Sequence, residues 1–295
     1  DIETFIHMGD QAALYETARL SGTKSYALHL PKSIEKHAKL MDEKLADITI
    51  CDPAVGSGAF PVGMMTEIVR VRSALTPYFN DVRERTPYHF KRHAIQNCLY
   101  GVDIDPGAIE IAKLRLWLSL VVDEEDVKQI KPLPNLDYKI VTGNSLLGVK
   151  KDLFNESLFR QLEELKPRYF DEPDKEKKDE YKQRIENIIH ELTNGKQVFD
   201  FEIYFSEVFH KTKGFAIIIG NPPYNAELTE TERSDYKKRF ESVRSGRQDT
   251  AAIFVEVATK IAPHGAVITY ILPYRLFSRK RNHGQFQLWL LEHHD

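Results

Sequence analysis

Residues 47–60 read DITICDPAVGSGAF and give the clearest indication of the fold. Asp47 to Cys51 is a short run rich in β-branched residues, which is typical of a strand. The run stops at Asp52-Pro53, a glycine-containing loop follows, and a helical pattern then extends from Ala59 to Ala74. A strand, a glycine loop and a helix in this order are typical of the first unit of a doubly wound α/β domain.

The alternation of strands and helices continues toward the C-terminus. Further strands are expected at Cys98 to Ile104, Tyr138 to Thr142, Phe215 to Gly220 and Ala266 to Leu272, and helices at Ala108 to Val122 and Asp249 to Ala262. The run from Phe215 to Gly220 is apolar throughout, so we expect that strand to be buried on both faces. The alternation predicts an α/β fold with a Rossmann-like, doubly wound, mostly parallel sheet.

Pattern and composition divide the chain into four segments. These are a helical segment at 1–46, the two halves of the α/β domain at 47–150 and 214–295, and a charged helical insertion at 151–213. The insertion is rich in Lys and Glu at helical spacing, which favours a solvated excursion. Residues 76–96 show no clear period and read as a second insertion. Because the chain starts with Asp1 and ends abruptly at Asp295, we expect a piece of a longer protein with an incomplete second half.

The composition excludes several classes of protein. With 42% hydrophobic and 29% charged residues among 295, the chain has a globular balance. Its apolar runs are too short to span a bilayer, and no secretory leader is expected. Cys51 and Cys98 cannot build a disulfide framework, which favours the cytoplasm, and the scattered histidines predict no metal site. A net charge of −3 restricts any nucleic-acid site to a local basic patch.

The loop from Asp52 to Phe60 has the features of a ligand site. Gly56 and Gly58 let the backbone pass close to a ligand because they carry no Cβ. A dinucleotide fingerprint needs a third glycine where this chain has Pro61, and a phosphate-binding P-loop needs a Gly-Lys-Ser/Thr that does not follow. Asp52 would repel phosphate but suits an amino group or a sulfonium. The alternative is a tight turn that binds no ligand.

The next two strand ends also carry polar side chains. Asp103 can accept hydrogen bonds from both hydroxyls of a ribose, and Ile104 can pack on a purine face. Asp105-Pro106 reads as a helix start, with Asp as the N-cap. Asn144 could bind an adenine edge through its amide, although a turn-forming Asn fits the same position.

Residues 219–224 read IGNPPY, directly after the apolar fourth strand. Pro222 and Pro223 fix φ and donate no backbone hydrogen bond, so their carbonyls act only as acceptors. The Asn221 amide adds a second kind of acceptor, and Tyr224 offers a flat face for a planar ring. Acceptors that converge on one point suit an amino group with two N–H bonds. The alternative is a proline-rich turn with a half-buried tyrosine.

Asp52 to Phe60 together with Asn221 to Tyr224 resembles the S-adenosylmethionine-dependent DNA adenine-N6 methyltransferases, whose domain has the class I methyltransferase fold. The likeness is greatest to the methylase portions of type IIG restriction-modification enzymes and runs from about residue 48 to 290. It implies S-adenosylmethionine as cofactor and double-stranded DNA as partner. It also implies a target-recognition domain beyond this piece of the chain. Residues 47–150 would form the cofactor-binding half of the domain, and residues 214–295 the catalytic half.

The resemblance also implies roles for individual residues. Those implied in cofactor binding are Asp52, Pro53, Ala54, Gly56, Gly58, Phe60, Asp103, Ile104 and Asn144. Those implied in catalysis are Asn221, Pro222, Pro223 and Tyr224. Asp52 would lie near the cofactor's amino group, Asp103 would hold the ribose, and Asn144 would face the adenine amine, where the family often has Asp. Asn221 and the Pro222 carbonyl would accept from the target amine while Tyr224 stacks on the base.

Basic residues after the Asn-Pro-Pro-Tyr loop are expected to contact DNA phosphates. They are Lys237, Lys238, Arg239, Arg247, Arg275, Arg279 and Arg281. The alternative for the first cluster is that its side chains are solvated charges on a helix; in this list the cluster comprises Lys237, Lys238, Arg239 and Arg247. Three other functions stay open: methylation of another planar amine such as an RNA base or a glutamine side chain, a non-catalytic binding module, and a dinucleotide oxidoreductase, which Pro61 disfavours.

Overall fold

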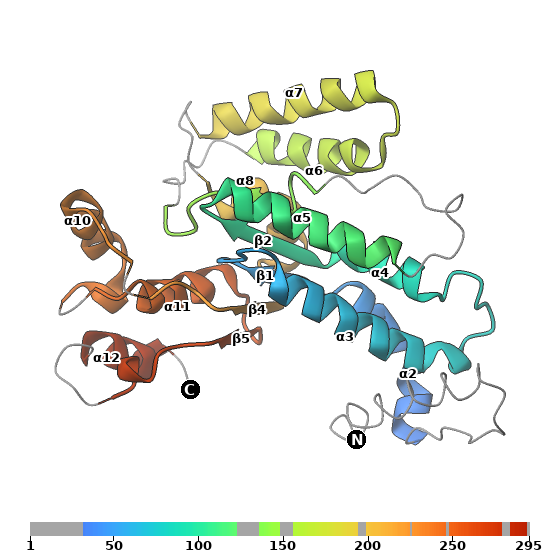
Figure 1. Ribbon diagram of the computed structural model, residues 1–295, viewed down its shortest axis with the longest axis horizontal. Coiled ribbons are helices and arrows are strands. Elements are labelled where there is room, and N and C mark those ends of the chain that lie inside the picture. The colour runs from blue at the N-terminus through green and yellow to red at the C-terminus, as the bar shows by residue number, and fades with distance from the viewer. Residues whose placement is uncertain are drawn as a thin grey trace. The chain divides into compact units, whose positions relative to one another are not determined.

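The computed structural model describes residues 32–122, 136–147, 156–193, 199–224, 226–245, 248–278 and 284–293 (Figure 1). The chain divides into two compact units. The helical unit comprises Asp1–Ile48, Pro61–Leu99 and Leu114–Pro134, and the sheet unit comprises Thr49–Phe60, Tyr100–Lys113 and Asn135–Asp295.

The strands form one open sheet. They are β1 (Ile50–Asp52), β2 (Leu99–Asp103), β3 (Ile140–Thr142), β4 (Ile217–Gly220) and β5 (Val267–Tyr270). Their order is β3-β2-β1-β4-β5, of which Figure 1 labels all but β3, and the β1–β4, β2–β3 and β4–β5 pairs run parallel. The order reverses between β1 and β4, the switch point at which doubly wound sheets bind ligands. The predicted Rossmann-like fold is confirmed.

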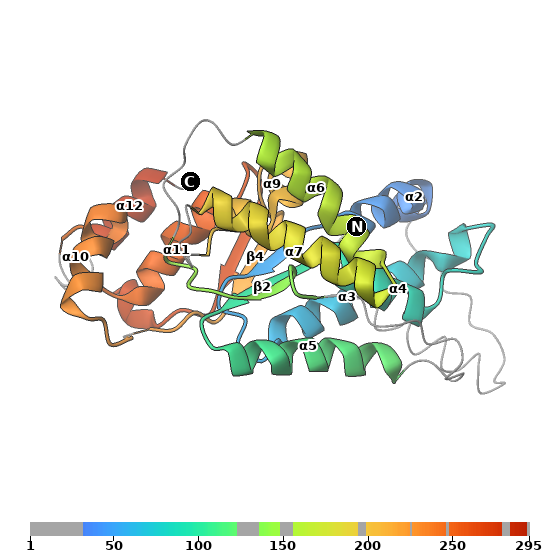
Figure 2. The ribbon, with the colours of Figure 1, turned by 90° about the horizontal axis from the view of Figure 1, so that it is seen from above.

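The helices of the sheet unit begin where the sequence offers capping side chains. They are α8 (Phe201–Tyr204), α9 (Ser206–Thr212), α10 (Glu230–Arg239), α11 (Thr250–Ile261) and α12 (Gly284–His293), with the 3₁₀ turns η3 (Glu241–Val243) and η4 (Tyr274–Leu276). Thr229 and Glu232 form a capping box at α10. The Asp249 side chain caps α11 by accepting from the Ala251 N–H at 3.1 Å. Figures 1 and 2 show α10, α11 and α12 gathered at one end of this unit.

The core of the sheet unit lies around α11. This helix buries residues on nearly all sides, since eight of the twelve residues of its sequence TAAIFVEVATKI are apolar. An aromatic cluster continues the core, with the Tyr100 ring 5.1 Å from that of Phe205 and 5.2 Å from that of Phe215 in edge-on contacts. Burial along β4 alternates, however: Ile218 is buried while Ile217 and Ile219 are only half-buried. The expectation that β4 is buried on both faces was wrong, because an apolar run indicates hydrophobicity but not which side is covered.

The charged insertion contains a helical hairpin of α6 (Glu156–Asp171) and α7 (Lys175–Leu192). Pro173 lies in the short turn between the two helices. The two helices lie side by side (Figure 2) and bury Leu162 and Ile185, so only the remaining faces are solvated. Lys166 is also buried: its Nζ donates to the Ile203 carbonyl at 3.2 Å and pairs with Glu207 Oε2 at 3.3 Å. The hairpin is therefore tied to α8 and α9 by a buried ammonium group.

The helical unit contains α2 (Lys32–Ala46), most of α3 (Ala59–Leu75), the 3₁₀ turn η1 (Thr76–Tyr78) and α4 (Pro87–Asn97). A fourth helix, α5 (Pro106–Val121), begins in the sheet unit and ends in this one. The sequence analysis missed α4, although Thr86 caps it and Pro87 occupies its first turn. Asp42 joins Arg72 and Arg85 in ion pairs of 3.0 and 2.9 Å. Among the described residues, no helix combines the length and the hydrophobicity that a membrane crossing needs.

Candidate active site

The carboxyl ends of β1 and β4 meet inside the sheet unit. The strands pair in parallel with Cys51 opposite Ile218, so Asp52 and Gly220 end near each other. A Cβ atom at position 220 would lie 2.7 Å from Asp52 Oδ1, closer than such atoms approach. A side chain at position 220 would therefore displace the Asp52 carboxylate or the end of β4, and the loop that follows Gly220 starts against this carboxylate.

The glycine loop after β1 has a defined shape. The Ala54 N–H donates to Asp52 Oδ1 at 3.0 Å. Gly56 and Gly58 have φ angles of 49° and 82°, which side chains disfavour. A Cβ at Gly58 would lie 2.9 Å from the Cβ of Ala112, whereas one at Gly56 would meet no described atom within 4 Å. Gly58 thus permits close helix packing, and Gly56 borders open space. Phe60, in the first turn of α3, is half-buried.

Asp103 connects the end of β2 to the glycine loop. Its Oδ2 accepts from the Gly56 N–H at 2.8 Å, and its Oδ1 accepts from the Asp105 N–H at 3.0 Å. Each carboxylate oxygen retains a lone pair for a further donor. Ile104 is 69% exposed. The end of β2 therefore offers two acceptors and a free apolar side chain at adjacent positions.

Asp52 is the most perturbed acid of the site. It is 1% exposed, and its Oδ2 has no hydrogen-bond partner among the described residues. Burial raises the pKa of Asp52 to about 7, the Ala54 N–H opposes this, and the charge of Asp103 adds to it. The Tyr270 hydroxyl on β5 is likewise buried and without a partner among these residues. Such an orphaned carboxylate oxygen is matched by a ligand that donates hydrogen bonds.

The loop after β3 is engaged by the protein itself. Asn144 Oδ1 accepts from the Leu146 N–H at 2.9 Å. Burial raises the pKa of Tyr236, and a side-chain hydrogen bond from Asn144 opposes this in part. Asn144 therefore forms a turn, as the alternative interpretation expected. Ser145, which the sequence analysis did not single out, donates to the Pro53 carbonyl at 2.6 Å and ties this loop to the glycine loop.

Two acceptors of the Asn-Pro-Pro-Tyr loop have no hydrogen-bond partner among the described residues. Asn221 is exposed and Pro222 is buried, and neither the Asn221 amide nor the Pro222 carbonyl is hydrogen-bonded to another described residue. The Pro223 carbonyl, in contrast, accepts from Thr250 Oγ1 at 2.6 Å. Tyr224 is 50% exposed. The loop thus presents two free oxygens and an accessible ring beside the carboxylate of Asp52.

The sequence profile of the Eco57I restriction-modification methylases matches residues 97–295, which include the ends of β2, β3 and β4. The chain belongs to this family. Its members are methylases, and the matched residues include the Asn-Pro-Pro-Tyr loop, whereas the glycine loop precedes them.

Two curated proteins are similar to parts of this methylase. It is 44% identical over 110 residues, or 36% of the chain, to the putative type II restriction enzyme and methyltransferase RM.MjaORFECS2P of Methanocaldococcus jannaschii. It is 28% identical over 256 residues, or 80% of the chain, to the type II restriction enzyme and methyltransferase RM.Eco57I of Escherichia coli. The alignments cover 9% and 20% of those two proteins, so the chain spans a small part of either. The resemblance to restriction-modification methylases is confirmed.

The basic residues of the methylase have different surroundings. Lys237, Lys238 and Arg239 are exposed in the last turn of α10, where Arg239 pairs with Asp235 at 3.0 Å. Arg275 pairs with Asp249 at 2.8 Å. The other predicted phosphate contacts, Arg247, Arg279 and Arg281, lie outside the described residues.

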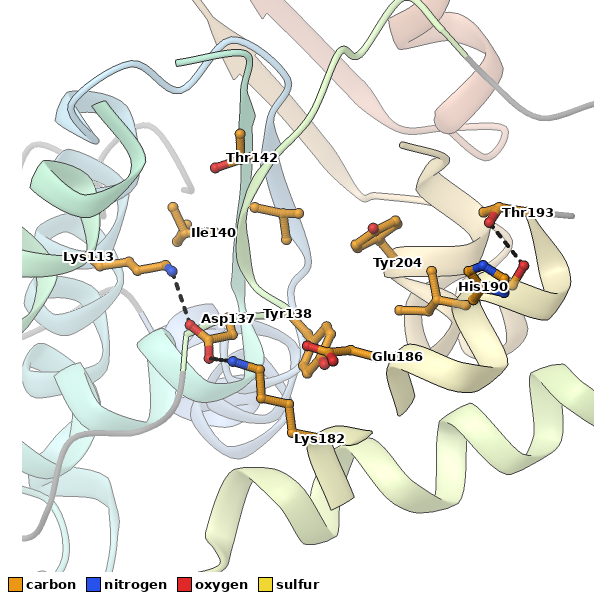
Figure 3. A pocket seen from close by; sticks show the side chains of 12 residues that line it. Lys113, Asp137, Tyr138, Ile140, Thr142, Lys182, Glu186, His190, Thr193 and Tyr204 are labelled. Carbon is orange, nitrogen blue, oxygen red and sulfur yellow. Dashed lines mark hydrogen bonds and ion pairs between the residues drawn. The ribbon is translucent and has the colours of Figure 1, made fainter. Parts of the chain in front are cut away.

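A separate cavity of 470 Å³ lies between β3 and α7 of the methylase (Figure 3). Its charged side chains pair with each other: Lys113 Nζ lies 3.0 Å from Asp137 Oδ1, and Lys182 Nζ lies 4.0 Å from Asp137 Oδ2. Tyr138 and Tyr204 also line it. The cavity contains none of the predicted site residues. No cluster of three potential metal ligands occurs among the residues that the structure describes.

Proposed function

We propose that this methylase transfers a methyl group from S-adenosylmethionine to N6 of an adenine flipped out of double-stranded DNA. The contact between Asp52 and Gly220 is the observation that carries this proposal. It sets the glycine loop beside the Asn-Pro-Pro-Tyr loop, so a methyl donor on the first would face an amino group on the second. Both relatives are named restriction enzymes as well as methyltransferases, which favours DNA as the substrate.

The ends of β1 and β2 fit S-adenosylmethionine. The orphaned Asp52 Oδ2 would accept a hydrogen bond from the cofactor's amino group, and open space beside Gly56 leaves room for its chain. Asp103 would accept the ribose hydroxyls, and Ile104 would cover one face of the adenine. Asn144 Oδ1 already accepts from the Leu146 N–H and would use its second lone pair for the adenine amine. When bound, the cofactor supplies an electrophilic methyl group.

The Asn-Pro-Pro-Tyr loop supplies the acceptors for the target amine. The lone pair of adenine N6 is delocalised into the ring, which makes the amine a poor nucleophile. Asn221 Oδ1 and the Pro222 carbonyl would each accept one N6 hydrogen and draw the nitrogen toward tetrahedral geometry. Because Pro222 and Pro223 have fixed φ angles, the oxygens would be held in place before the base arrives. Catalysis would then rest on positioning rather than on a covalent enzyme intermediate.

The target base must leave the duplex because N6 is paired inside it. Tyr224 would stack on the flipped adenine, for which its ring has the required exposure. The exposed end of α10 would contribute phosphate contacts. Since the chain covers only 20% of RM.Eco57I, we assign target recognition to a part of the full-length protein outside this sequence.

Tritiated methyl transfer from S-adenosylmethionine to unmethylated DNA by the full-length protein tests this proposal. We expect the label in N6-methyladenine, and we expect Asn221→Ala to lower the rate by at least about a hundredfold. Asn97→Ala, at the exposed end of α4, is the matched control and should keep full activity. Equal incorporation by Asn221→Ala would reject the assigned role. Transfer to RNA or to protein glutamine in place of DNA would favour the alternative substrates.

A further inference from the structure

Two contacts hold the loop around Tyr224 to the start of α11. Thr250, the first residue of α11, donates from Oγ1 to the Pro223 carbonyl at 2.6 Å. The same oxygen accepts from the Ala226 N–H at 3.4 Å. One hydroxyl group therefore bonds to the backbone on both sides of Tyr224, before it and after it. This fixes the path of the chain that carries the ring.

Arg275 makes the second contact. Its Nη2 and Nε lie 2.8 and 3.2 Å from Asp249 Oδ2, and its Cζ lies over the Tyr224 ring, 5.6 Å from the ring centroid. That distance is within the range of a cation–π interaction. Asp249 has no exposed surface, and its other oxygen accepts from the Ala251 N–H at 3.1 Å. The guanidinium group is therefore anchored to the rigid start of α11 while it covers one side of the tyrosine.

The charge of Arg275 is committed to this arrangement. Breaking the pair would leave the Asp249 carboxylate buried without a counter-charge, which is strongly unfavourable. A DNA phosphate would thus have to compete with a buried carboxylate for the same guanidinium. Lys237 and Lys238 at the end of α10 are exposed and form no ion pair with another residue that the structure describes. The sequence alone grouped all these residues as phosphate contacts, but their surroundings separate them.

We propose that Arg275 and Thr250 are positioning residues that hold Tyr224 ready to stack on the flipped target base, and that Arg275 does not act as a phosphate contact. This inference rests on the proposed function. With a guanidinium on one side and half of its surface exposed, the ring has its remaining face available for the base. Loss of either contact would let the ring move, so fewer bound bases would reach the reactive geometry.

The salt dependence of DNA binding separates the two roles of Arg275. Removing a phosphate contact lowers the slope of log K against log salt by about 0.9, whereas removing a positioning residue leaves the slope unchanged. We would compare Arg275→Gln with Lys238→Gln in the full-length protein, on unmethylated plasmid DNA. For Arg275→Gln we expect an unchanged slope and a kcat at least about tenfold lower at saturating DNA. For Lys238→Gln we expect a shallower slope, as the loss of a phosphate contact requires.

Conservative variants complete the test. Arg275→Lys keeps a cation near both Asp249 and Tyr224 and should recover part of the kcat. Thr250→Ser should have a higher kcat than Thr250→Val because serine keeps the hydroxyl group. If Arg275→Gln does not fold, the Thr250 pair decides the question alone. The inference is overturned if Arg275→Gln keeps the wild-type kcat and shows a shallower slope. It is also overturned if Thr250→Val has the same kcat as Thr250→Ser. An absence of DNA methylation by the wild-type protein would instead reject the proposed function.

Discussion

The Gly56 N–H donates to Asp103 Oδ2 at 2.8 Å, across 47 positions of sequence. This bond joins the loop after β1 to the end of β2 and orients the carboxylate beside the open space at Gly56. The other carboxylate oxygen is also oriented, by the Asp105 N–H. The group proposed to bind the ribose is therefore held in place by the backbone before a ligand arrives, which lowers the ordering cost of binding.

Asp103→Asn should weaken binding of S-adenosylhomocysteine by at least about tenfold. The new NH₂ group would face a backbone N–H that now donates to Asp103, and one ribose acceptor would be lost. Isothermal titration calorimetry measures the change. Asp105→Asn is the matched control, because Asp105 accepts from the Gly107 N–H at the start of α5 and Asn serves equally well there. Equal loss of affinity in both variants would contradict the separate roles of the two acids.

Gly220→Ala should abolish binding of S-adenosylhomocysteine and lower the thermal unfolding midpoint. The added Cβ would come within 2.7 Å of Asp52 Oδ1, so either the carboxylate or the end of β4 would have to move. Gly63→Ala, inside α3, is the control: no described atom lies within 4 Å of its new Cβ, and alanine favours a helix by about 1 kcal/mol. Wild-type affinity in Gly220→Ala would show that β1 and β4 do not meet as described.

The affinity for S-adenosylhomocysteine should rise with pH between about 6 and 8, because Asp52 has a pKa of about 7 and only its ionised form favours a bound ammonium group. The ligand-free stability should change in the opposite direction. The folded pKa lies above the ordinary value of 3.8, so this contribution to stability is complete below pH 3.8 and is lost as the pH rises to about 7. Calorimetry between about pH 6 and 8 measures the change in affinity. Thermal unfolding between pH 3.8 and about 7 measures the change in stability.

Asp52→Asn separates this contribution from those of other titrating groups. The variant should bind the ligand weakly and with little pH dependence, and it should gain stability relative to the wild type as the pH rises toward 7. Parallel pH profiles of the two proteins would contradict the assignment of the titration to Asp52.

Lys166→Met should lower the thermal unfolding midpoint, with a loss of about 3 kcal/mol in stability. Burial raises the pKa of Glu207, but Lys166 and Lys139 outweigh it and hold that pKa at about 2. Removing the Lys166 ammonium leaves Glu207 with Lys139 as its remaining ion-pair partner among the described residues. It also removes a hydrogen-bond donor from the Ile203 carbonyl. Arg83→Gln is the control, because its ion pair with Asp81 is fully solvated and should contribute nothing measurable. A stable Lys166→Met protein would show that the hairpin does not depend on this contact.

Patterns in short stretches were sufficient to predict the α/β fold and the loops that make up the candidate site. The β-branched run before Asp52 and the apolar run before Asn221 indicate strands wherever the rest of the chain lies, and glycine and proline define the loops after them. Helix α4 could also have been found, since Thr86-Pro87 is a local start signal. These features depend on neighbours within a few residues.

The partners of the charged and polar side chains could not be predicted in this way. Arg275 and Lys238 look alike in the sequence, but one faces the buried carboxylate of Asp249 and the other faces solvent. The Asp52 carboxylate likewise meets Gly220, 168 positions later, only because β1 and β4 pair, and its Oδ2 is left without a partner among the described residues. Local preference sets the backbone of each segment, whereas burial and pairing depend on groups that meet only when distant segments pack together.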